Sequence, residues 1–150
     1  MRRMFGMLLA ALVLVGGAVR GEARDVETIG APLAIGDQLI FYYDARDDYT
    51  TFLTVKNGGN DQLTVAMLFY GPTFSTPLSK AITLPGGALE VVDVGALRAN
   101  GLPDQPGVAI ATAGNLGGQP VVSQALTGNF TVANLSTGSA FGANAAARLA

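Results

Sequence analysis

Between residues 38 and 135 the chain repeats one pattern, a short run rich in Val, Ile, Thr, Phe and Tyr that ends at Gly, Pro, Asn or Asp. The runs recur about every 10 to 15 residues, a spacing that is typical of all-β sandwiches. Eight runs are interpreted as strands: 38–43, 49–56, 62–70, 78–84, 88–94, 108–113, 121–127 and 130–135. The sequence therefore predicts an all-β fold with a single antiparallel β-sandwich of seven or eight strands.

Alternation within the runs predicts which side chains face the core. In 62–70 the residues Leu63, Val65, Met67 and Phe69 share one side, because side chains alternate along a strand. The same reasoning places three further pairs inside: Leu53 with Val55, Ile82 with Leu84, and Val108 with Ile110. Some runs are apolar on both sides, notably around Phe41 and Leu68, so parts of an outer face are expected to be covered.

The opposite side of run 108–113 consists of Ala109, Ala111 and Ala113, and these small side chains predict a face that another segment can approach closely. A helical turn is expected at Gly95–Asn100, with Asp93 as its cap and Gly101 and Pro103 after its end.

The amino-terminal residues have the pattern of an export signal. Arg2 and Arg3 precede an uncharged apolar run at 7–19. This run is shorter than the roughly 20 residues that a helix needs to cross a bilayer, so it predicts a cleavable signal rather than an anchor. Gly21 and Ala23 are small residues at the spacing that a signal peptidase reads, which predicts cleavage after Ala23. We therefore expect a secreted, periplasmic or cell-surface protein without stable membrane insertion after cleavage.

Four parts follow from these patterns. They are a signal peptide at 1–23, an extended lead-in segment at 24–37, the β-sandwich at 38–136 and a flexible Ala/Gly-rich tail at 137–150. The lead-in carries too little hydrophobic pattern for a confident strand, so it is a candidate for strand addition to a neighbouring molecule. The alternative is that it folds back as an edge strand or remains a flexible terminus.

Composition excludes several classes of function. The chain has no Cys and no His, so the fold has no disulfides, and Ser–His or Cys–His nucleophile systems cannot form within one chain. Cleavage removes Arg2, Arg3, Arg20 and Glu22, which changes the net charge from −2 to about −4. This charge disfavours nucleic acids and anionic membranes as partners. We expect a protein that is not an enzyme.

The densest polar cluster is the segment from Asp44 to Asp48. Asp44, Asp47 and Asp48 are candidate calcium ligands, because Ca²⁺ prefers carboxylate, carbonyl and water oxygens. The alternative is a solvated turn in which Arg46 neutralises a neighbouring carboxylate. The EF-hand pattern is absent, which favours the turn, and no other cofactor is expected.

Four tyrosines lie near strand ends: Tyr42, Tyr43, Tyr49 and Tyr70. Gathered on one face, they would bind a sugar or a protein partner through their aromatic rings. The alternative is rim packing, in which each ring covers the edge of the core and each hydroxyl stays in water.

The segments FYYDARDDYTTFLTVKN, LTVAMLFYGP, LPGGALEVVDV and GVAIATA resemble a broad set of uncharacterised secreted bacterial immunoglobulin-like β-sandwich proteins. The shared features are structural: a strand that ends in Asn57, a following strand that ends in Phe69-Tyr70, and a Pro-Gly-Gly turn. The resemblance implies an immunoglobulin-like sandwich at a cell surface or in secreted material, and it implies no activity.

These observations predict an exported, non-enzymatic structural module that is able to self-associate or to contact a surface protein or polysaccharide. The alternative is a carbohydrate- or protein-binding adhesion module that uses the loop from Asp44 to Tyr49.

Overall fold

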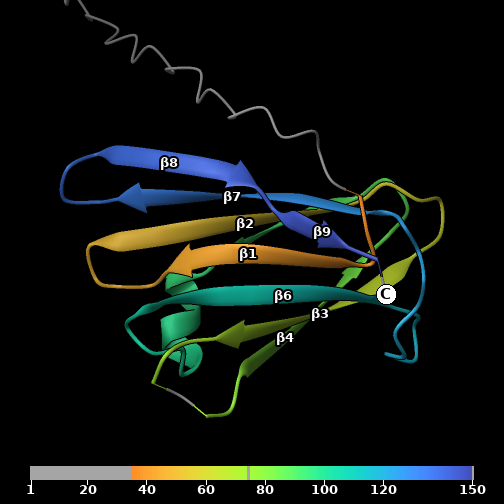
Figure 1. Ribbon diagram of the computed structural model, residues 1–150, viewed down its shortest axis with the longest axis horizontal. Helices are drawn as coiled ribbons and strands as arrows, with labels where there is room; N and C mark the ends of the chain where they lie inside the picture. Colours follow the sequence, from red (N-terminus) through yellow and green to blue (C-terminus); the bar gives the residue numbers. More distant parts are fainter. Residues whose placement is uncertain (1–34, 74, 150) are drawn as a thin grey trace, which may run out of the picture.

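The computed structural model describes residues 35–73 and 75–149, which form a two-layer antiparallel β-sandwich (Figure 1). Within these residues there are nine strands and one short 3-10 helix. The elements are β1 (Gln38–Asp44), β2 (Tyr49–Asn57), β3 (Leu63–Tyr70), β4 (Leu78–Leu84), β5 (Leu89–Asp93), η1 (Gly95–Asn100), β6 (Pro106–Gly114), β7 (Leu126–Asn134), β8 (Ser139–Asn144) and β9 (Ala146–Arg148). The all-β sandwich prediction is confirmed, with nine described strands in place of seven or eight.

One sheet has five strands in the order β4-β3-β6-β1-β9, and the other has four in the order β5-β2-β7-β8. β2 pairs with β5, and β3 pairs with β6, as strand B pairs with E and C with F in an immunoglobulin sandwich. β1, however, pairs with β6, and β7 pairs with β2. The first and seventh strands therefore occupy the places that the last and first strands have in the immunoglobulin order.

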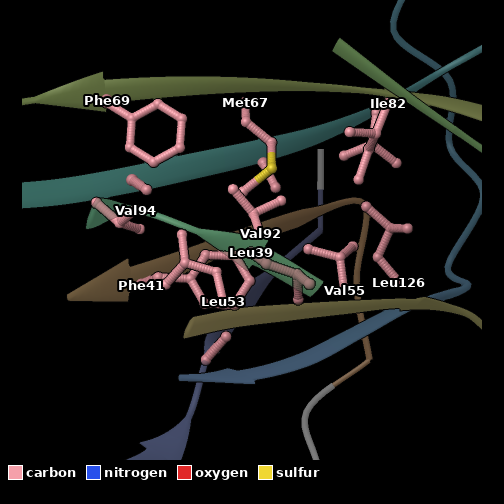
Figure 2. Packing of buried hydrophobic residues seen from close by; sticks show 14 of the residues in the cluster. Leu39, Phe41, Leu53, Val55, Met67, Phe69, Ile82, Val92, Val94 and Leu126 are labelled. Atoms are coloured by element: carbon pink, nitrogen blue, oxygen red, sulfur yellow. The ribbon is translucent and has the colours of Figure 1, made fainter. Parts of the chain in front are cut away.

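The core lies between the two sheets, and β3 supplies the side chains that the alternation predicted. Leu63, Val65, Met67 and Phe69 are all buried. Figure 2 shows Met67 and Phe69 pointing from β3 toward the second sheet, from which Leu53 and Val55 approach. The predicted inward pair of β4, Ile82 with Leu84, is buried as well.

In β6 the alternation prediction is wrong by one residue. Val108 is 40% exposed and Ile110 is half-buried on the outer face, whereas the alanines on the opposite side are fully buried. The buried residues are Ala109, Ala111 and Ala113. The alanine face is thus part of the core and is closed to any other segment.

The strands on either side of β6 explain why its alanine face is the buried one. In the strand register Ala109 lies between Phe41 of β1 and Phe69 of β3. Both rings are buried, and close packing requires small residues beside large ones. Alanine on the central strand therefore makes room for the large side chains on both sides of it.

The expected flexible tail is also wrong, because residues 139–148 form β8 and β9. β8 pairs with β7 in the four-stranded sheet, and β9 pairs with β1 in the five-stranded sheet (Figure 1). Ala145, between them, is buried, and its N–H donates to the carbonyl of Gly128 at 2.9 Å. One segment thus supplies an outermost strand to each sheet, and backbone hydrogen bonds rather than a hydrophobic pattern hold it there.

The two strands predicted at 121–127 and 130–135 are a single strand, β7, preceded by an irregular segment. Gly128 falls between the two predicted runs, but it lies inside β7 where the core approaches the backbone closely. A Cβ there would lie 2.5 Å from the carbonyl oxygen of Thr54 and 2.9 Å from the ring of Phe41. Gly128 is therefore a packing residue of the strand.

The last residues of the lead-in belong to the sandwich. Gly36 exchanges two backbone hydrogen bonds of 3.1 Å with Leu126, which links the first strand to the opposite sheet. The buried carboxylate of Asp37 accepts hydrogen bonds of 2.6 Å from the backbone N–H groups of Ser123 and Gln124. These contacts favour the fold-back alternative for residues 36 and 37.

The rest of the lead-in, the predicted signal peptide and its predicted cleavage site fall in residues 1–34, outside the described part of the chain. In the described part, no helix is long and apolar enough to span a bilayer.

The N-cap residue is Val94 rather than the predicted Asp93, but the predicted helical turn itself is confirmed as η1. Gly101 ends it with a φ of 95°, and the Asp93 carboxylate accepts from the N–H of Ala96 at a long 3.4 Å. The same carboxylate accepts a shorter bond of 2.9 Å from the Thr50 hydroxyl. Asp93 therefore links the first turn of η1 to β2.

Candidate functional site

The acidic loop between β1 and β2 is closed by an ion pair. Arg46 donates to the Asp44 carboxylate from Nη2 at 2.6 Å and from Nε at 3.0 Å, and its guanidinium lies 4.7 Å from the centre of the Tyr49 ring. Burial raises the pKa of Asp44, but the hydrogen bonds and charge of Arg46 outweigh burial and hold this pKa below its usual value. The Asp44 carboxylate in turn raises the pKa of Arg46. The loop thus satisfies its best-buried charge internally.

The other two acidic residues of the loop have different partners. Asp47 forms an ion pair with Arg98 of η1, and the Asp48 carboxylate accepts from the Ser136 hydroxyl at 2.9 Å. Residues 35–73 and 75–149 contain no group of three acidic side chains placed to hold a metal ion. The structure therefore does not support the calcium prediction for Asp44, Asp47 and Asp48, because their carboxylates are directed to three separate contacts. The ion pair of Arg46 with Asp44 agrees with the alternative, a solvated turn in which Arg46 neutralises a neighbouring carboxylate.

The four tyrosines do not form one face. Tyr43 is fully buried, packs edge-on against Phe69 at 5.7 Å, and donates its hydroxyl to the carbonyl of Tyr70 at 3.0 Å. Burial raises the pKa of Tyr43 to about 12. The prediction of a partner-binding role is therefore wrong for Tyr43, which is a core residue. Tyr49 is half-buried beneath Arg46, and only Tyr42 and Tyr70 are exposed on the outer surface.

Tyr42 and Tyr70 belong to an apolar patch on the outside of the five-stranded sheet. In the register Tyr42 lies beside Val108, which lies beside Tyr70, and the next row contains Ile40, Ile110 and Leu68. We call these six residues on β1, β6 and β3 the outer apolar face. Four of them are between 37% and 40% exposed, and Leu68 and Ile110 are half-buried. None of the six carries a charge.

Such a face is unusual for a sheet in water. Antiparallel sheets that face solvent usually carry polar residues on that side. A contiguous apolar patch on a soluble domain often marks a contact site. Beside the outer apolar face lies a hollow of about 310 Å³, lined by Leu68, Thr64 and Gln38 together with residues of the loop after β6. The outer apolar face is the strongest candidate functional surface of the described residues.

A second aromatic group connects β1 of the five-stranded sheet with β7 and β8 of the four-stranded sheet. The ring centre of Tyr42 is 6.2 Å from that of Phe130 on β7 and 6.5 Å from that of Phe141 on β8. Phe141 is 53% exposed. Burial, followed by the charge of Asp44, raises the pKa of Tyr42. We call Tyr42, Phe130 and Phe141 the edge aromatic cluster. Sequence reasoning missed it because 137–150 was interpreted as a tail.

No family model and no curated protein matches the chain. A crystal structure of a Thermotoga maritima protein is similar in fold, with a TM-score of 0.57 and 9% sequence identity. The similarity covers 75% of this chain and 95% of the Thermotoga protein. At this identity it shows the fold alone, and it agrees with the two-sheet architecture described above.

Proposed function

We propose that the protein is an exported, non-enzymatic β-sandwich that acts as a structural module at the cell surface or in extracellular material. The outer apolar face carries this proposal, because it offers a flat uncharged surface on the three central strands of one sheet. Covering the exposed part of each of its side chains would contribute on the order of 1 kcal/mol to an interface. The sequence supplies an export pattern and lacks the His and Cys residues of the common nucleophile systems.

The second candidate is a carbohydrate-binding adhesion module. Tyr42 and Tyr70 favour it, because their exposed rings lie in one row with a single strand between them. Two strand spacings place them about 10 Å apart on a flat surface. In this candidate the loop from Asp44 to Tyr49 would border the ligand rather than coordinate it, since Asp44 and Asp47 are in ion pairs and Asp48 accepts a hydrogen bond from Ser136.

Light scattering on mature protein, residues 24–150, separates the two candidates. The structural function predicts concentration-dependent association that Val108→Lys weakens, because a charge is placed at the centre of the outer apolar face. The matched control is Thr83→Lys, on the exposed side of β4 outside this face, which should leave association unchanged. A protein that stays monomeric and is retained on insoluble polysaccharide through Tyr42 and Tyr70 would contradict the structural function and support the adhesion module.

Export is tested separately by intact-mass measurement of the protein recovered outside the cytoplasm. We expect a mature amino terminus at Arg24, because Gly21 and Ala23 supply the small residues before the cleavage point. Recovery of uncleaved chain in the membrane fraction would show that 7–19 is an anchor.

A further inference from the structure

The sheet edges differ in how they are protected against pairing with another chain. Natural sheets protect their edges with inward-pointing charges, with prolines or with very short strands. On β4, Lys80 lies opposite the buried Met67, and on β5, Glu90 lies opposite the buried Val55. Both charges thus occupy inward-facing positions of their edge strands. β9 has three residues, one of them Arg148.

β8 has none of these devices. Its sequence, SAFGAN, contains no charge and no proline over six residues, and β8 forms an end of the four-stranded sheet. The inward-facing position that holds a charge in the other long edge strands holds Phe141 here, opposite the buried Val132. Phe141 is nevertheless 53% exposed. β8 is therefore the edge that is open to strand addition.

The hydrogen-bond phase of β8 decides which residues can pair outward. The N–H of Ala145 donates to the carbonyl of Gly128, so the backbone groups of Ala145 point toward β7. This direction alternates along a strand, so the backbone N–H and C=O groups of Phe141 and Ala143 also point toward β7. The backbone groups of Ala140 and Gly142 consequently point away from the sheet. An added antiparallel strand must form hydrogen bonds with the backbone N–H and C=O groups of these two residues.

The absence of charge on β8 favours a second copy of β8 as the added strand. In a twofold pairing each strand meets its own copy, so a charged edge would meet like charges, whereas β8 meets none. The lead-in residues 24–34, RDVETIGAPLA, are a poorer fit, because they carry three charges and a proline.

We propose that two copies of the protein associate by antiparallel pairing of β8 with β8 about a twofold axis at Phe141. Ala140 of each copy then pairs with Gly142 of the other through the outward backbone groups. Phe141 lies opposite Phe141 of the second copy in a non-hydrogen-bonded pair, in which side chains are closest. The two edge aromatic clusters meet across the axis, and the four-stranded sheets join into one continuous sheet. This contact deepens the proposed structural function and does not use the outer apolar face beyond Tyr42.

Charge complementation at Phe141 tests the proposal. Phe141→Glu and Phe141→Lys should each raise the dissociation constant of the dimer about tenfold or more, because each variant meets its own charge across the axis. An equimolar mixture of the two variants should restore the dimer. The interface is small, so light scattering is measured over a wide concentration range. A monomer at every concentration, or association that neither variant weakens, would overturn the proposal.

Cysteine cross-linking tests the register, because the chain has no other Cys. Phe141→Cys should form a disulfide dimer on oxidation, since the two residues face each other. Ala143→Cys is exposed on the same strand, but the two copies of residue 143 lie about 13 Å apart in this register, beyond disulfide reach. Equal cross-linking of both variants would contradict the register.

Two further variants distinguish the β8 contact from association through the outer apolar face and from strand addition by the lead-in. Val108→Lys should leave the β8 dimer intact, and so should deletion of 24–34. Loss of association in Val108→Lys but not in the Phe141 variants would preserve the proposed function and disprove the β8 contact. Loss of the dimer on deletion of 24–34 would favour strand addition by the lead-in instead.

Discussion

Val65→Asp should lower the free energy of unfolding by about 3 kcal/mol or more, whereas Thr64→Asp should change it by less than about 1 kcal/mol. Val65 is fully buried on β3, between Ile82 of β4 and Ala113 of β6 in the register. A carboxylate there loses its hydration and gains no partner, which is among the most destabilising changes that a core residue can undergo. Thr64 faces outward, where water can still hydrate the new charge.

Urea unfolding followed by circular dichroism measures both variants. Their adjacency makes them a matched pair, because a slip of one residue in the register of β3 would exchange the two faces. Equal unfolding midpoints would show that β3 has no single buried face.

Asp37→Ala should cost about 2 to 4 kcal/mol of stability. The side chain is 1% exposed and accepts the N–H groups of both Ser123 and Gln124. Removing it leaves two backbone donors without this acceptor, and each costs about 1 to 3 kcal/mol where water cannot replace the carboxylate, with the smaller cost at the exposed Gln124. Gln124 also has a φ of 46°, a left-handed conformation that costs a non-glycine residue about 1 to 2 kcal/mol. Asp37 therefore holds a strained segment against β1.

Thermal and urea unfolding of Asp37→Ala should be compared with Asp61→Ala, which removes an exposed carboxylate and should have little effect. Asp37→Asn keeps an acceptor oxygen and should lose less stability than Asp37→Ala. If Asp37→Ala and Asp61→Ala unfold at the same urea concentration, Asp37 does not anchor residues 123 and 124.

Strand positions were predictable where strand-forming residue types, their alternation and the turn residues that follow them all indicate the same bounds. The first six strands lie within two residues of their predicted bounds, because β-branched and aromatic residues alternate there and turn residues end each run. β6 shows the limit of hydrophobicity as a guide. Its most apolar residues, Val108 and Ile110, face outward, and the small Ala109 instead occupies the buried space between the rings of Phe41 and Phe69. That space is a property of the neighbouring strands and cannot be inferred from the run itself.

The end of the chain was mispredicted for a different reason. β8 and β9 consist mainly of Ala, Gly, Ser and Asn, residues without strong strand preference, and they are held by backbone pairing to β7 and β1. β8 pairs with the strand just before it in the chain, whereas β9 pairs with β1, about 100 residues earlier, whose open edge cannot be inferred from the tail sequence. The edge aromatic cluster was missed with it, since Phe141 has no aromatic neighbour in the sequence.

The candidate site residues lie in places that the sequence indicated only in part. The acidic loop was correctly placed between two strands, but the directions of its three carboxylates depend on η1 and on the turn after β7. Tyr42 and Tyr43 could not both belong to one face, because consecutive strand residues point to opposite sides. Tyr70 and Tyr42 share a face through the pairing of β3, β6 and β1, which sequence alone does not provide.

The pairing of β1 has a consequence for the time at which the protein can fold. β1 finds its partners in β6 and β9, which are made much later in synthesis. Contacts between residues so distant in sequence slow folding, since a large loop must close before they form. A nascent chain lacking residues 106–148 lacks both strands that pair with β1 in the described part of the structure. The pairs of β2 with β5 and of β3 with β4 can form early, whereas the five-stranded sheet is completed only when β6 and β9 have been made.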